Sequence, residues 1–341
     1  MRVEEFDYYL PASLIAQVPI EPRDASRLLV VDRAASSLAH HLFSQLPDLL
    51  HSGDLLVVND SRVMPARLHG VRTRGGGAAE VLLLRDLGEN RWLCLTRPAK
   101  RIRTGDVLTF GAGTLSGEVQ EECSEGQRVI RFDVANGTFM AVLAQLGEMP
   151  LPPYIHSRLE NPERYQTVYA RELGSAAAPT AGLHFTPGLL DRIRQAGIGV
   201  AYVTLHVGLG TFRPVQVDEV TQHHMHAEYG ILSAETAAEI ASVRSRGGHV
   251  IAVGTTAMRV LESAALAAPD SAWSGWTDIF IYPGFTFRVV DALVTNFHLP
   301  RSTLLMLVSA FAGKRLIDEA YAEAIRERYR FFSFGDAMLL L

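Results

Sequence analysis

The order of strands and helices constrains the fold of this chain most strongly, because two patterns alternate along it. Residues 63–147 are rich in short strands that turns of Gly, Asp and Asn separate. Regular short strands of this kind are typical of a small β-barrel or sandwich. We expect one helix there, over 139–146, and strands over 81–84, 92–95, 107–110, 117–120 and 128–134.

Strands alternate with longer helices in the rest of the chain, which favours a mostly parallel sheet covered by helices. Helices are expected over 187–196, 235–246, 257–268 and 302–311, the third capped by Thr255–Thr256, and strands over 54–58, 199–206, 250–253, 277–282 and 289–295. The sequence therefore predicts an α/β fold. Residues 1–62 and 148–341 form a (β/α) barrel-like catalytic core, favoured over a doubly wound sheet, and residues 63–147 form an inserted small antiparallel β-barrel domain.

Composition excludes several classes of protein. The chain has 341 residues, 48% of them apolar, which suffices for a large core and excludes a disordered or fibrous chain. Cys94 and Cys123 are the only cysteines, so a disulfide scaffold and a cysteine-based zinc site are excluded and a reducing cytoplasm is favoured. The acidic N-terminus is unlike a secretory signal, and the longest apolar helical run, 304–312, is too short to span a bilayer. We expect a cytoplasmic protein without a membrane partner.

The charge of the chain is unevenly distributed. The net charge is −5, which by itself disfavours a nucleic-acid partner. Residues 61–103, however, contain ten basic residues and three acidic ones, a net charge of +7. Phosphate recognition depends on such a local field rather than on total charge. This segment is therefore either a solvated β-surface or a phosphate-binding surface.

Polar residues recur where the expected strands of the core end. In a parallel α/β core, the active site lies at the carboxyl ends of the strands. Such residues are Asn59-Asp60-Ser61-Arg62, His206, Gly254-Thr255-Thr256 with Arg259, and Asn296 with His298. Thr180, Gly182 and His184 belong to a loop of small residues, 174–186. Each alone could be a capping residue, but together they predict a site.

Two glycine-containing segments invite a phosphate-binding interpretation. Gly208-Leu209-Gly210 lacks the third glycine of the dinucleotide fingerprint, because Arg213 stands at that position. Gly254-Thr255-Thr256 is a better anion site, since the free N–H groups and dipole of a helix start favour a carboxylate or phosphate. An ordinary threonine cap is the alternative.

Titratable side chains are densest at His223, His224, His226 and Glu228. In an extended chain His224, His226 and Glu228 project on one face. With His206 and His298 they resemble the ligands of a metal-dependent hydrolase, although such an enzyme usually has a carboxylate where this chain has Asn296. We favour acid/base or hydrogen-bonding histidines.

The sequence resembles the S-adenosylmethionine:tRNA ribosyltransferase-isomerase (QueA) family of queuosine biosynthesis over nearly its whole length. The motifs that carry the resemblance are Arg23-Asp-Ala-Ser-Arg-Leu-Leu-Val30, Val58-Asn-Asp-Ser-Arg-Val-Met-Pro-Ala-Arg67, Pro150-Leu-Pro-Pro-Tyr-Ile155, Arg164-Tyr-Gln-Thr-Val-Tyr-Ala170, Ala178-Pro-Thr-Ala-Gly-Leu-His-Phe-Thr186, Thr204-Leu-His-Val-Gly-Leu-Gly-Thr-Phe-Arg-Pro-Val215, Met225-His-Ala-Glu-Tyr229, Val253-Gly-Thr-Thr-Ala-Met-Arg259, Thr295-Asn-Phe-His-Leu-Pro-Arg-Ser-Thr-Leu304 and Tyr329-Arg-Phe-Phe-Ser-Phe-Gly-Asp-Ala-Met338. Ser61 stands where the family has threonine, which keeps the hydroxyl.

The resemblance implies a reaction in which S-adenosylmethionine is a ribosyl-donating cosubstrate. Its ribosyl group is transferred and isomerised onto the 7-aminomethyl-7-deazaguanine at the wobble position of tRNA. The products are epoxyqueuosine-tRNA, adenine and methionine. The family's α/β-barrel core with an inserted β-barrel domain agrees with the fold expected from the patterns. No metal, membrane or protein partner is implied, and we expect a monomer.

This reaction needs residues in several roles. A base must remove a proton from the 5′ carbon that the sulfonium acidifies; the candidates are Asp60, His184, His206 and His226, with Glu228 a further catalytic candidate. His298 or Asn296 would help adenine to leave. The methionine carboxylate would bind at Gly254, Thr255, Thr256 and Arg259, and Thr180 completes the cosubstrate site.

The tRNA needs stacking and phosphate contacts. Tyr154, Tyr169 and Phe185 are candidate platforms for the deazaguanine. The candidate phosphate-binding residues are Arg62, Arg67, Arg97, Lys100, Arg101 and Arg103. Two alternatives stay open: a metal-dependent hydrolase, which would hold stoichiometric zinc, and a non-catalytic tRNA-binding module, which would release no adenine.

Overall fold

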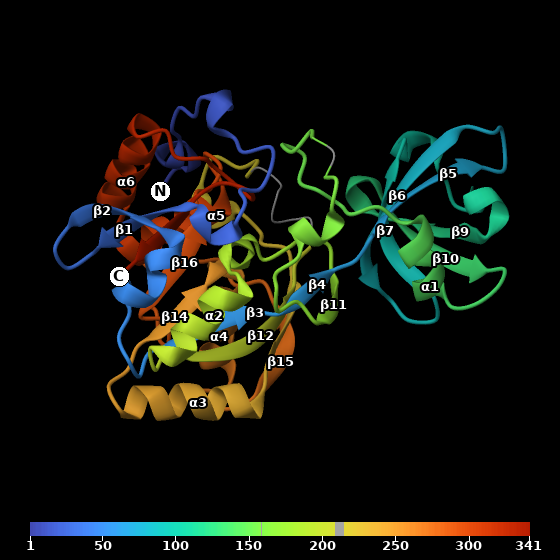
Figure 1. Ribbon diagram of the computed structural model, residues 1–341. Coiled ribbons are helices and arrows are strands. Elements are labelled where there is room, and N and C mark those ends of the chain that lie inside the picture. The colour runs from blue at the N-terminus through green and yellow to red at the C-terminus, as the bar shows by residue number, and fades with distance from the viewer. Residues whose placement is uncertain (158, 209–214) are drawn as a thin grey trace. The chain divides into compact units, whose positions relative to one another are not determined.

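A computed structural model describes residues 1–157, 159–208 and 215–341 of the chain (Figure 1). Its contacts divide the chain into two compact units. The core unit comprises Met1–Arg62, Pro153–Glu172 and Ala178–Leu341, and the insert unit comprises Val63–Pro152 and Leu173–Ala177. The chain passes between them in β4 (Ser61–Val63) and β11 (Glu172–Ser175), which form a two-stranded sheet.

The core unit contains one nine-stranded mixed sheet. In spatial order its strands are β15 (Trp273–Thr277), β13 (Glu228–Leu232), β12 (Gly199–His206), β3 (Leu55–Asn59), β14 (Val250–Val253), β16 (Ala292–Asn296), β17 (Ala337–Leu340), β1 (Arg27–Asp32) and β2 (Ser37–Leu42). β12, β3, β14 and β16 are parallel neighbours, and β17 and β1 are parallel to each other. The pairs β15–β13, β13–β12, β16–β17 and β1–β2 are antiparallel.

The expectation of a (β/α) barrel-like core is not confirmed. Within the described ranges the sheet has two ends, β15 and β2, and four antiparallel pairings. The local alternation of strand and helix is common to barrels and open sheets, so it cannot decide between them. The predicted α/β class is confirmed in its coarser form, a mixed α/β unit with a large sheet and a separate small β-barrel.

Alternate residues of the core strands face two separate apolar layers. Leu55 and Val57 of β3 pack in one cluster, with the helices α3 (Ala234–Ser245), α4 (Gly254–Ala267), α5 (Thr303–Ala312) and α6 (Lys314–Arg326). Leu56 and Val58 pack in the other, with α2 (Pro187–Gln195) and the 3₁₀ helices η4 (Phe43–Leu49) and η9 (Thr180–His184). This period of two makes a sheet with helices on both faces.

Hydroxyl side chains begin several helices where the sequence changes from loop to helix. The N-caps of α2, α3 and α5 are Thr186, Ser233 and Ser302. Each hydroxyl accepts the backbone N–H of the residue three positions later in the chain. Further 3₁₀ helices among the described residues of the core unit are η1 (Val3–Phe6), η2 (Ala12–Leu14), η3 (Arg23–Ala25), η8 (Pro162–Tyr165) and η11 (Val220–Gln222). No helix in the described ranges combines the length and apolar character that crossing a bilayer requires.

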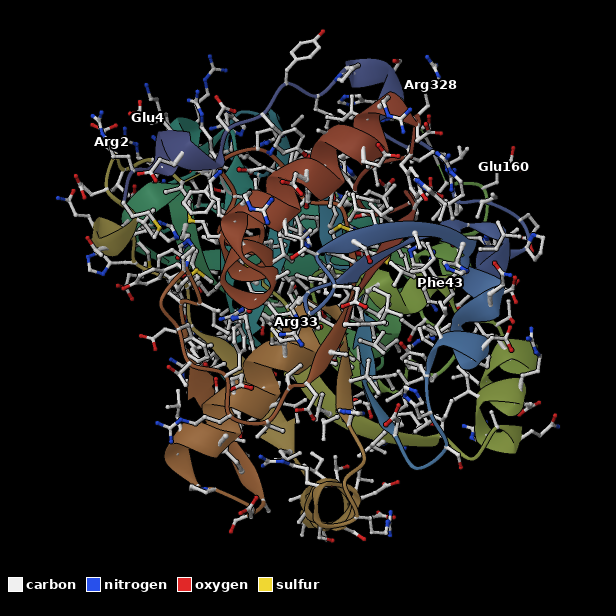
Figure 2. The ribbon with its side chains drawn as sticks, turned by 90° about the vertical axis from the view of Figure 1, so that its left-hand side faces the viewer. Arg2, Glu4, Arg33, Phe43, Glu160 and Arg328 are labelled. Carbon is white, nitrogen blue, oxygen red and sulfur yellow. The ribbon has the colours of Figure 1, made fainter. Side chains whose placement is uncertain are left out.

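Arg33, labelled in Figure 2, fixes the C-terminal strand in the sheet. Its guanidinium donates to the backbone carbonyls of Leu341, Phe311 and Asp291. β17 therefore lies between β16 and β1, which joins the two ends of the chain in one sheet.

The insert unit is a closed antiparallel barrel of six strands. The sequence predicts a small antiparallel β-barrel at this place in the chain. Its strands, in order around the barrel, are β10 (Gln127–Val134), β7 (Arg91–Arg97), β6 (Ala78–Asp86), β5 (Arg67–Arg72), β8 (Val107–Phe110) and β9 (Leu115–Glu122); its helices are α1 (Phe139–Leu146), η5 (Ala99–Arg101), η6 (Gly111–Gly113) and η7 (Ser124–Gly126). The unit extends past residue 147, because the backbone of Glu148 pairs with Arg67 and Met64 donates to Ser175.

Candidate active site

The polar residues predicted at strand ends gather at one edge of the core sheet. The carboxyl ends of the parallel strands β12, β3, β14 and β16 share this edge. Because β13 runs antiparallel to β12 and β17 runs antiparallel to β16, their first residues, Glu228 and Ala337, lie there too. Segments that are far apart in the sequence therefore supply one site.

A cavity in the core unit opens among these residues. It is lined by seven of the predicted site residues together with other loop residues: Tyr154, Thr180, Gly254, Thr255, Thr256, Asn296 and His298, with Ala178, Pro179, Ala181, Val207, Thr295, Phe297, Leu299, Ser302, Leu304, Phe332 and Ser333. Apolar walls with a few convergent polar groups are typical of a small-molecule site. Asp60, His184, His206, His226, Glu228 and Arg259 do not line it.

The first turn of α4 supplies the polar end of this cavity. Gly254 begins the helix with a φ of 89°. The expected cap by Thr255–Thr256 is wrong, because both residues lie inside the first turn and Val253 is the N-cap without a side-chain hydrogen bond. The N–H groups of a helix start have no partner within the helix. Within the described ranges the buried hydroxyl of Thr256 also has no hydrogen-bond partner, so this end of the cavity can accept an anion.

Arg259 lies one turn further along α4 but does not complete this anion site. Its Nη1 donates to Glu228 Oε2, and both side chains are only 5% exposed. Glu228 also accepts the N–H of Gly208 through Oε1, at 2.8 Å. The Arg259 guanidinium is therefore paired with Glu228, and Arg259 does not line the cavity.

His184 belongs to a hydrogen-bonded chain that ends in the cavity. Its Nδ1 lies 2.7 Å from Ser26 Oγ, and its Nε2 lies 3.2 Å from Asn296 Nδ2. Asn296 Oδ1 accepts from Thr180 Oγ1 at 2.9 Å. Burial, followed by the charges of Arg330 and Arg23, lowers the pKa of His184 to about 3. Since both ring nitrogens are occupied, the neutral ring positions Asn296 and Thr180.

Two aromatic contacts hold this chain of hydrogen bonds in place. The His184 ring stacks on Phe43, which begins η4 and is labelled in Figure 2, with ring centroids 4.8 Å apart. Phe43 also meets Phe185 edge to face. The ring of His184 therefore has little freedom to turn toward a substrate.

His298 lines the cavity from the segment after β16. Its Nε2 lies 2.9 Å from Thr295 Oγ1, and its backbone N–H donates to the hydroxyl of Tyr321. Burial lowers its pKa to about 3. A neutral imidazole can donate or accept one hydrogen bond at each nitrogen, but it does not carry a proton as a cation near neutral pH.

Two side chains hold the carboxylate of Asp60, which follows β3. Its carboxylate is 2% exposed and accepts from Thr204 Oγ1 at 2.7 Å and from Arg171 Nε at 2.6 Å. The hydrogen bond to Asp60 raises the pKa of Arg171, whose guanidinium lies over the ring of Tyr202. This carboxylate is therefore satisfied before any substrate binds.

His206, the last residue of β12, has an unused polar atom. Its Nδ1 is buried and has no hydrogen-bond partner among the described residues. Burial lowers the pKa of His206, whereas the carboxylates of Glu172 and Asp60 act in the opposite direction. The next residue, Val207, lines the cavity. A neutral histidine nitrogen can act as a general base where it comes within hydrogen-bond reach of the proton to be removed.

The histidine cluster does not form the predicted metal-binding face. β13 begins only at Glu228, and His224 and His226 are exposed in the preceding loop. In the part of the chain that the structure describes, the one group of ligand atoms close enough for a metal ion is His51, Asp54 and His249, elsewhere in the core unit. The geometry gives no support to the metal-dependent hydrolase alternative. The Leu209–Gly210 part of the glycine motif and Arg213 lie outside the described residues.

The predicted tRNA-binding residues fall into three groups. Arg97, Lys100, Arg101 and Arg103 of the insert unit are exposed, and no ion pair of their side chains occurs among the described residues. Arg67 lies 3.9 Å from Glu80, and Arg62, in the core unit, pairs with Glu163.

The tyrosines of the core unit differ in their surroundings. Tyr154 lines the cavity and lies 2.7 Å from Ser333 Oγ, and burial raises its pKa to about 12. Tyr169 packs edge to face against Phe185 and Tyr202. Burial raises the pKa of Tyr169. Tyr154 is therefore the tyrosine that can meet a ligand in the cavity.

Sequence reasoning missed Ser26, Arg171 and Ser333 as site residues. Ser26 holds His184, Arg171 neutralises Asp60, and Ser333 lines the cavity beside Tyr154. Ser26 and Ser333 stand inside motifs that carry the family resemblance, Arg23–Val30 and Tyr329–Met338, so a signal was present. Their contacts depend on chain segments more than 150 residues apart, which no local pattern reveals.

Comparisons with known proteins point to one family. The sequence matches the family described as "Queuosine biosynthesis protein" over residues 3–340. It is 59% identical to an S-adenosylmethionine:tRNA ribosyltransferase-isomerase from Symbiobacterium thermophilum and 57% identical to one from Moorella thermoacetica, each match covering 100% of both chains. It also matches the crystal structure of an S-adenosylmethionine tRNA ribosyltransferase from Thermotoga maritima, with 41% identity, a TM-score of 0.58 and coverage of 99% of this chain and 100% of that chain.

Proposed function

Because the chain belongs to the queuosine biosynthesis protein family over residues 3–340, we propose that it is an S-adenosylmethionine:tRNA ribosyltransferase-isomerase. It transfers and isomerises the ribosyl group of S-adenosylmethionine onto the 7-aminomethyl-7-deazaguanine at the wobble position of tRNA. Epoxyqueuosine-tRNA, adenine and methionine leave. S-adenosylmethionine is the only cosubstrate, and no metal takes part.

The methionine end of the cosubstrate binds at the first turn of α4. Its carboxylate accepts hydrogen bonds from the free N–H groups that follow Gly254 and from the hydroxyl of Thr256, which has no partner among the described residues. Thr180 and Asn296 lie on the cavity wall, held in place by His184. This assignment rests on the helix terminus and does not need Arg259.

His206 is the base that removes the proton from the 5′ carbon. Of the four candidates, His184 has both ring nitrogens occupied and Asp60 is neutralised by Arg171. His226 is exposed in a loop, whereas His206 directly precedes Val207 of the cavity wall and its Nδ1 has no partner among the described residues. Proton removal by a positioned histidine contributes about 10²- to 10⁴-fold to a rate.

Adenine leaves with a hydrogen bond from the cavity wall. His298 and Asn296 are both within the lining. The pKa of His298, lowered to about 3, makes a hydrogen-bond donor of this residue rather than a cationic acid. Tyr154 supplies the aromatic surface on which a deazaguanine stacks.

The tRNA phosphates bind to the exposed basic surface formed by Arg97, Lys100, Arg101 and Arg103. These four cations lie within seven residues, form no ion pair with another described residue, and supply the local field that a polyanion requires. The enzyme acts as a monomer in the cytoplasm, where it meets tRNA.

The single observation that carries this proposal is the 57–59% sequence identity, over the full length, to two enzymes of the same name. Mass spectrometry of the nucleosides from treated tRNA tests it. The deazaguanine should gain the ribosyl-derived group of S-adenosylmethionine; an unchanged deazaguanine after incubation with folded protein and S-adenosylmethionine would refute the assignment.

A further inference from the structure

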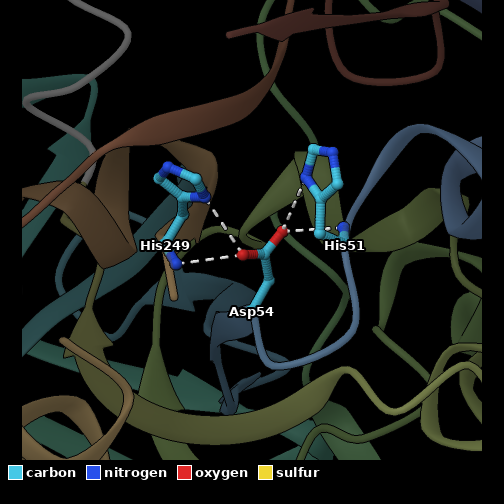
Figure 3. A group of neighbouring side chains, drawn as sticks. All are labelled: His51, Asp54 and His249. Atoms are coloured by element: carbon cyan, nitrogen blue, oxygen red, sulfur yellow. Dashed lines mark hydrogen bonds and ion pairs between the residues drawn. The ribbon is translucent and has the colours of Figure 1, made fainter. Parts of the chain in front are cut away.

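Two histidines and an aspartate lie together at the edge of the core sheet opposite the candidate active site (Figure 3). Asp54 directly precedes β3, and His249 directly precedes β14. The carboxyl ends of the same two strands lead to the candidate active site, so a strand of about 3.3 Å per residue separates the two places. His51, Asp54 and His249 each offer one ligand atom, and these atoms lie within 4.8 Å of one another.

The Asp54 carboxylate is fixed by two backbone groups. Its Oδ1 accepts the N–H of His249 at 2.9 Å, and its Oδ2 accepts the N–H of His51 at 2.8 Å. The side chain of Asp54 is only 4% exposed. Each carboxylate oxygen has a second lone pair, so both oxygens keep the capacity to bind another group.

The imidazole rings approach those same two oxygens. His249 Nδ1 lies 3.1 Å from Asp54 Oδ1, and His51 Nδ1 lies 3.7 Å from Asp54 Oδ2 (Figure 3). With metal–ligand bonds of about 2.0–2.2 Å, neighbouring ligand atoms of a tetrahedral zinc site lie about 3.3 Å apart. The observed separations lie on either side of that value. The His51 and His249 side chains are 82% and 58% exposed, so an ion can reach both rings and the rings can turn toward it.

We propose that His51, Asp54 and His249 form a binding site for a divalent transition-metal ion of the Zn²⁺ class, with water in the remaining position. Two imidazole nitrogens favour such an ion over Mg²⁺ or Ca²⁺, which prefer oxygen ligands. The backbone N–H groups that hold the carboxylate act as the outer shell that orients a ligand. A bound ion joins the turn before β3 to the start of β14 and stabilises the folded core unit, away from the proposed reaction.

Metal titration of the full-length protein tests this site. Metal-free protein is titrated with ZnCl₂ by calorimetry, and with CoCl₂ while the visible absorption of the bound ion is followed. We expect one ion per chain and a rise of the unfolding temperature with ZnCl₂ concentration, because binding to the folded state alone stabilises it. Loss of an outer-shell partner typically lowers metal affinity by about 10- to 100-fold. Because His51 and His249 bind the ion directly, His51→Ala and His249→Ala should each lower the affinity by more than that.

The histidine variants suit this test because they keep the backbone N–H groups that Asp54 accepts. His69→Ala is the matched control, since His69 is an exposed histidine 3.3 Å from a single carboxylate, Glu148. His69→Ala should bind the ion as the unchanged protein does. The proposal fails if the unchanged protein binds no ion at micromolar ZnCl₂. It fails equally if binding survives His51→Ala/His249→Ala and is lost in His223→Ala/His224→Ala.

Discussion

Arg259 and Glu228 form an ion pair between α4 and β13 in which each side chain is only 5% exposed. Glu228→Gln would leave the Arg259 cation buried without its counter-charge. We expect the free energy of unfolding to fall by about 3–5 kcal/mol. Urea unfolding at neutral pH measures this change. The double variant Glu228→Gln/Arg259→Met should recover most of the loss, since it removes both charges.

The same variant distinguishes a structural role of Glu228 from a catalytic one. A structural role predicts that Glu228→Gln loses stability, and loses turnover only to the extent that it unfolds. If Glu228→Gln unfolds like the unchanged protein but turns over no substrate, Glu228 takes part in the chemistry and its pairing with Arg259 is not its main role.

His206→Asn should lower kcat by at least about 100-fold, because it removes the base while a hydrogen-bonding side chain remains. Urea unfolding should change little, since Nδ1 of His206 has no partner to lose among the described residues. His224→Asn, in the exposed loop, is the control and should keep its turnover. Full activity of His206→Asn would move the base to another residue.

Thr256→Val should raise the KM for S-adenosylmethionine with little effect on kcat. A hydrogen bond to a charged group contributes about 1.5–3 kcal/mol, so the expected rise is about tenfold or more. Thr256→Ser keeps the hydroxyl and should restore the KM. A KM that is unchanged in the valine variant would place the carboxylate elsewhere.

Arg97→Ala and Arg101→Ala should weaken tRNA binding and lower its salt dependence. Each lost phosphate contact reduces the slope of log K against log salt by about 0.7–0.9. Binding measured at several salt concentrations gives this slope. Arg131→Ala is the control in the same unit, because Arg131 is already paired with Asp133. Equal slopes in all variants would exclude this surface as the phosphate site.

The buried histidines make the stability of the fold depend on pH. The pKa of His298 is about 3 in the folded protein, against an ordinary value of 6.5. Below pH 6.5 this histidine is protonated in the unfolded chain but stays neutral in the folded chain. The free energy of unfolding is therefore highest above pH 6.5 and decreases as the pH falls toward 3.

His298→Gln measures the contribution of this one residue. Between pH 7.5 and 5.5 its unfolding free energy should fall by about 1 kcal/mol less than that of the unchanged protein, since glutamine does not titrate. Urea unfolding at the two pH values gives the comparison. An identical fall in both proteins would mean that His298 is protonated in the folded state.

Local patterns predict those elements whose cause is local. The apolar run of β14 and the helix α1 stand where the sequence predicts them, and α2, α3 and β12 differ by a residue or less at either end. The expected strand over 277–282 is wrong, because β15 ends at Thr277, whose hydroxyl accepts the N–H of Ile279 and turns the chain.

Long-range pairing was not predictable in the same way. The insertion of β17 between β16 and β1 brings strands from the N-terminal and C-terminal parts of the chain into one mixed sheet. Likewise, the sequence predicted that Gly254–Thr256 begins a helix, but it did not predict the pairing of Arg259 with Glu228. The sequence predicted seven of the residues that line the cavity, whereas the hydrogen-bond partners of these residues required the tertiary structure.

Release of adenine from S-adenosylmethionine is the most direct test of the proposed reaction. With tRNA that carries 7-aminomethyl-7-deazaguanine at the wobble position, the enzyme should release adenine and methionine in equal amounts. With the same tRNA carrying guanine there, it should release neither. Formation of S-adenosylhomocysteine, or of no adenine at all with the modified tRNA, would contradict the assignment of this chain as a ribosyltransferase.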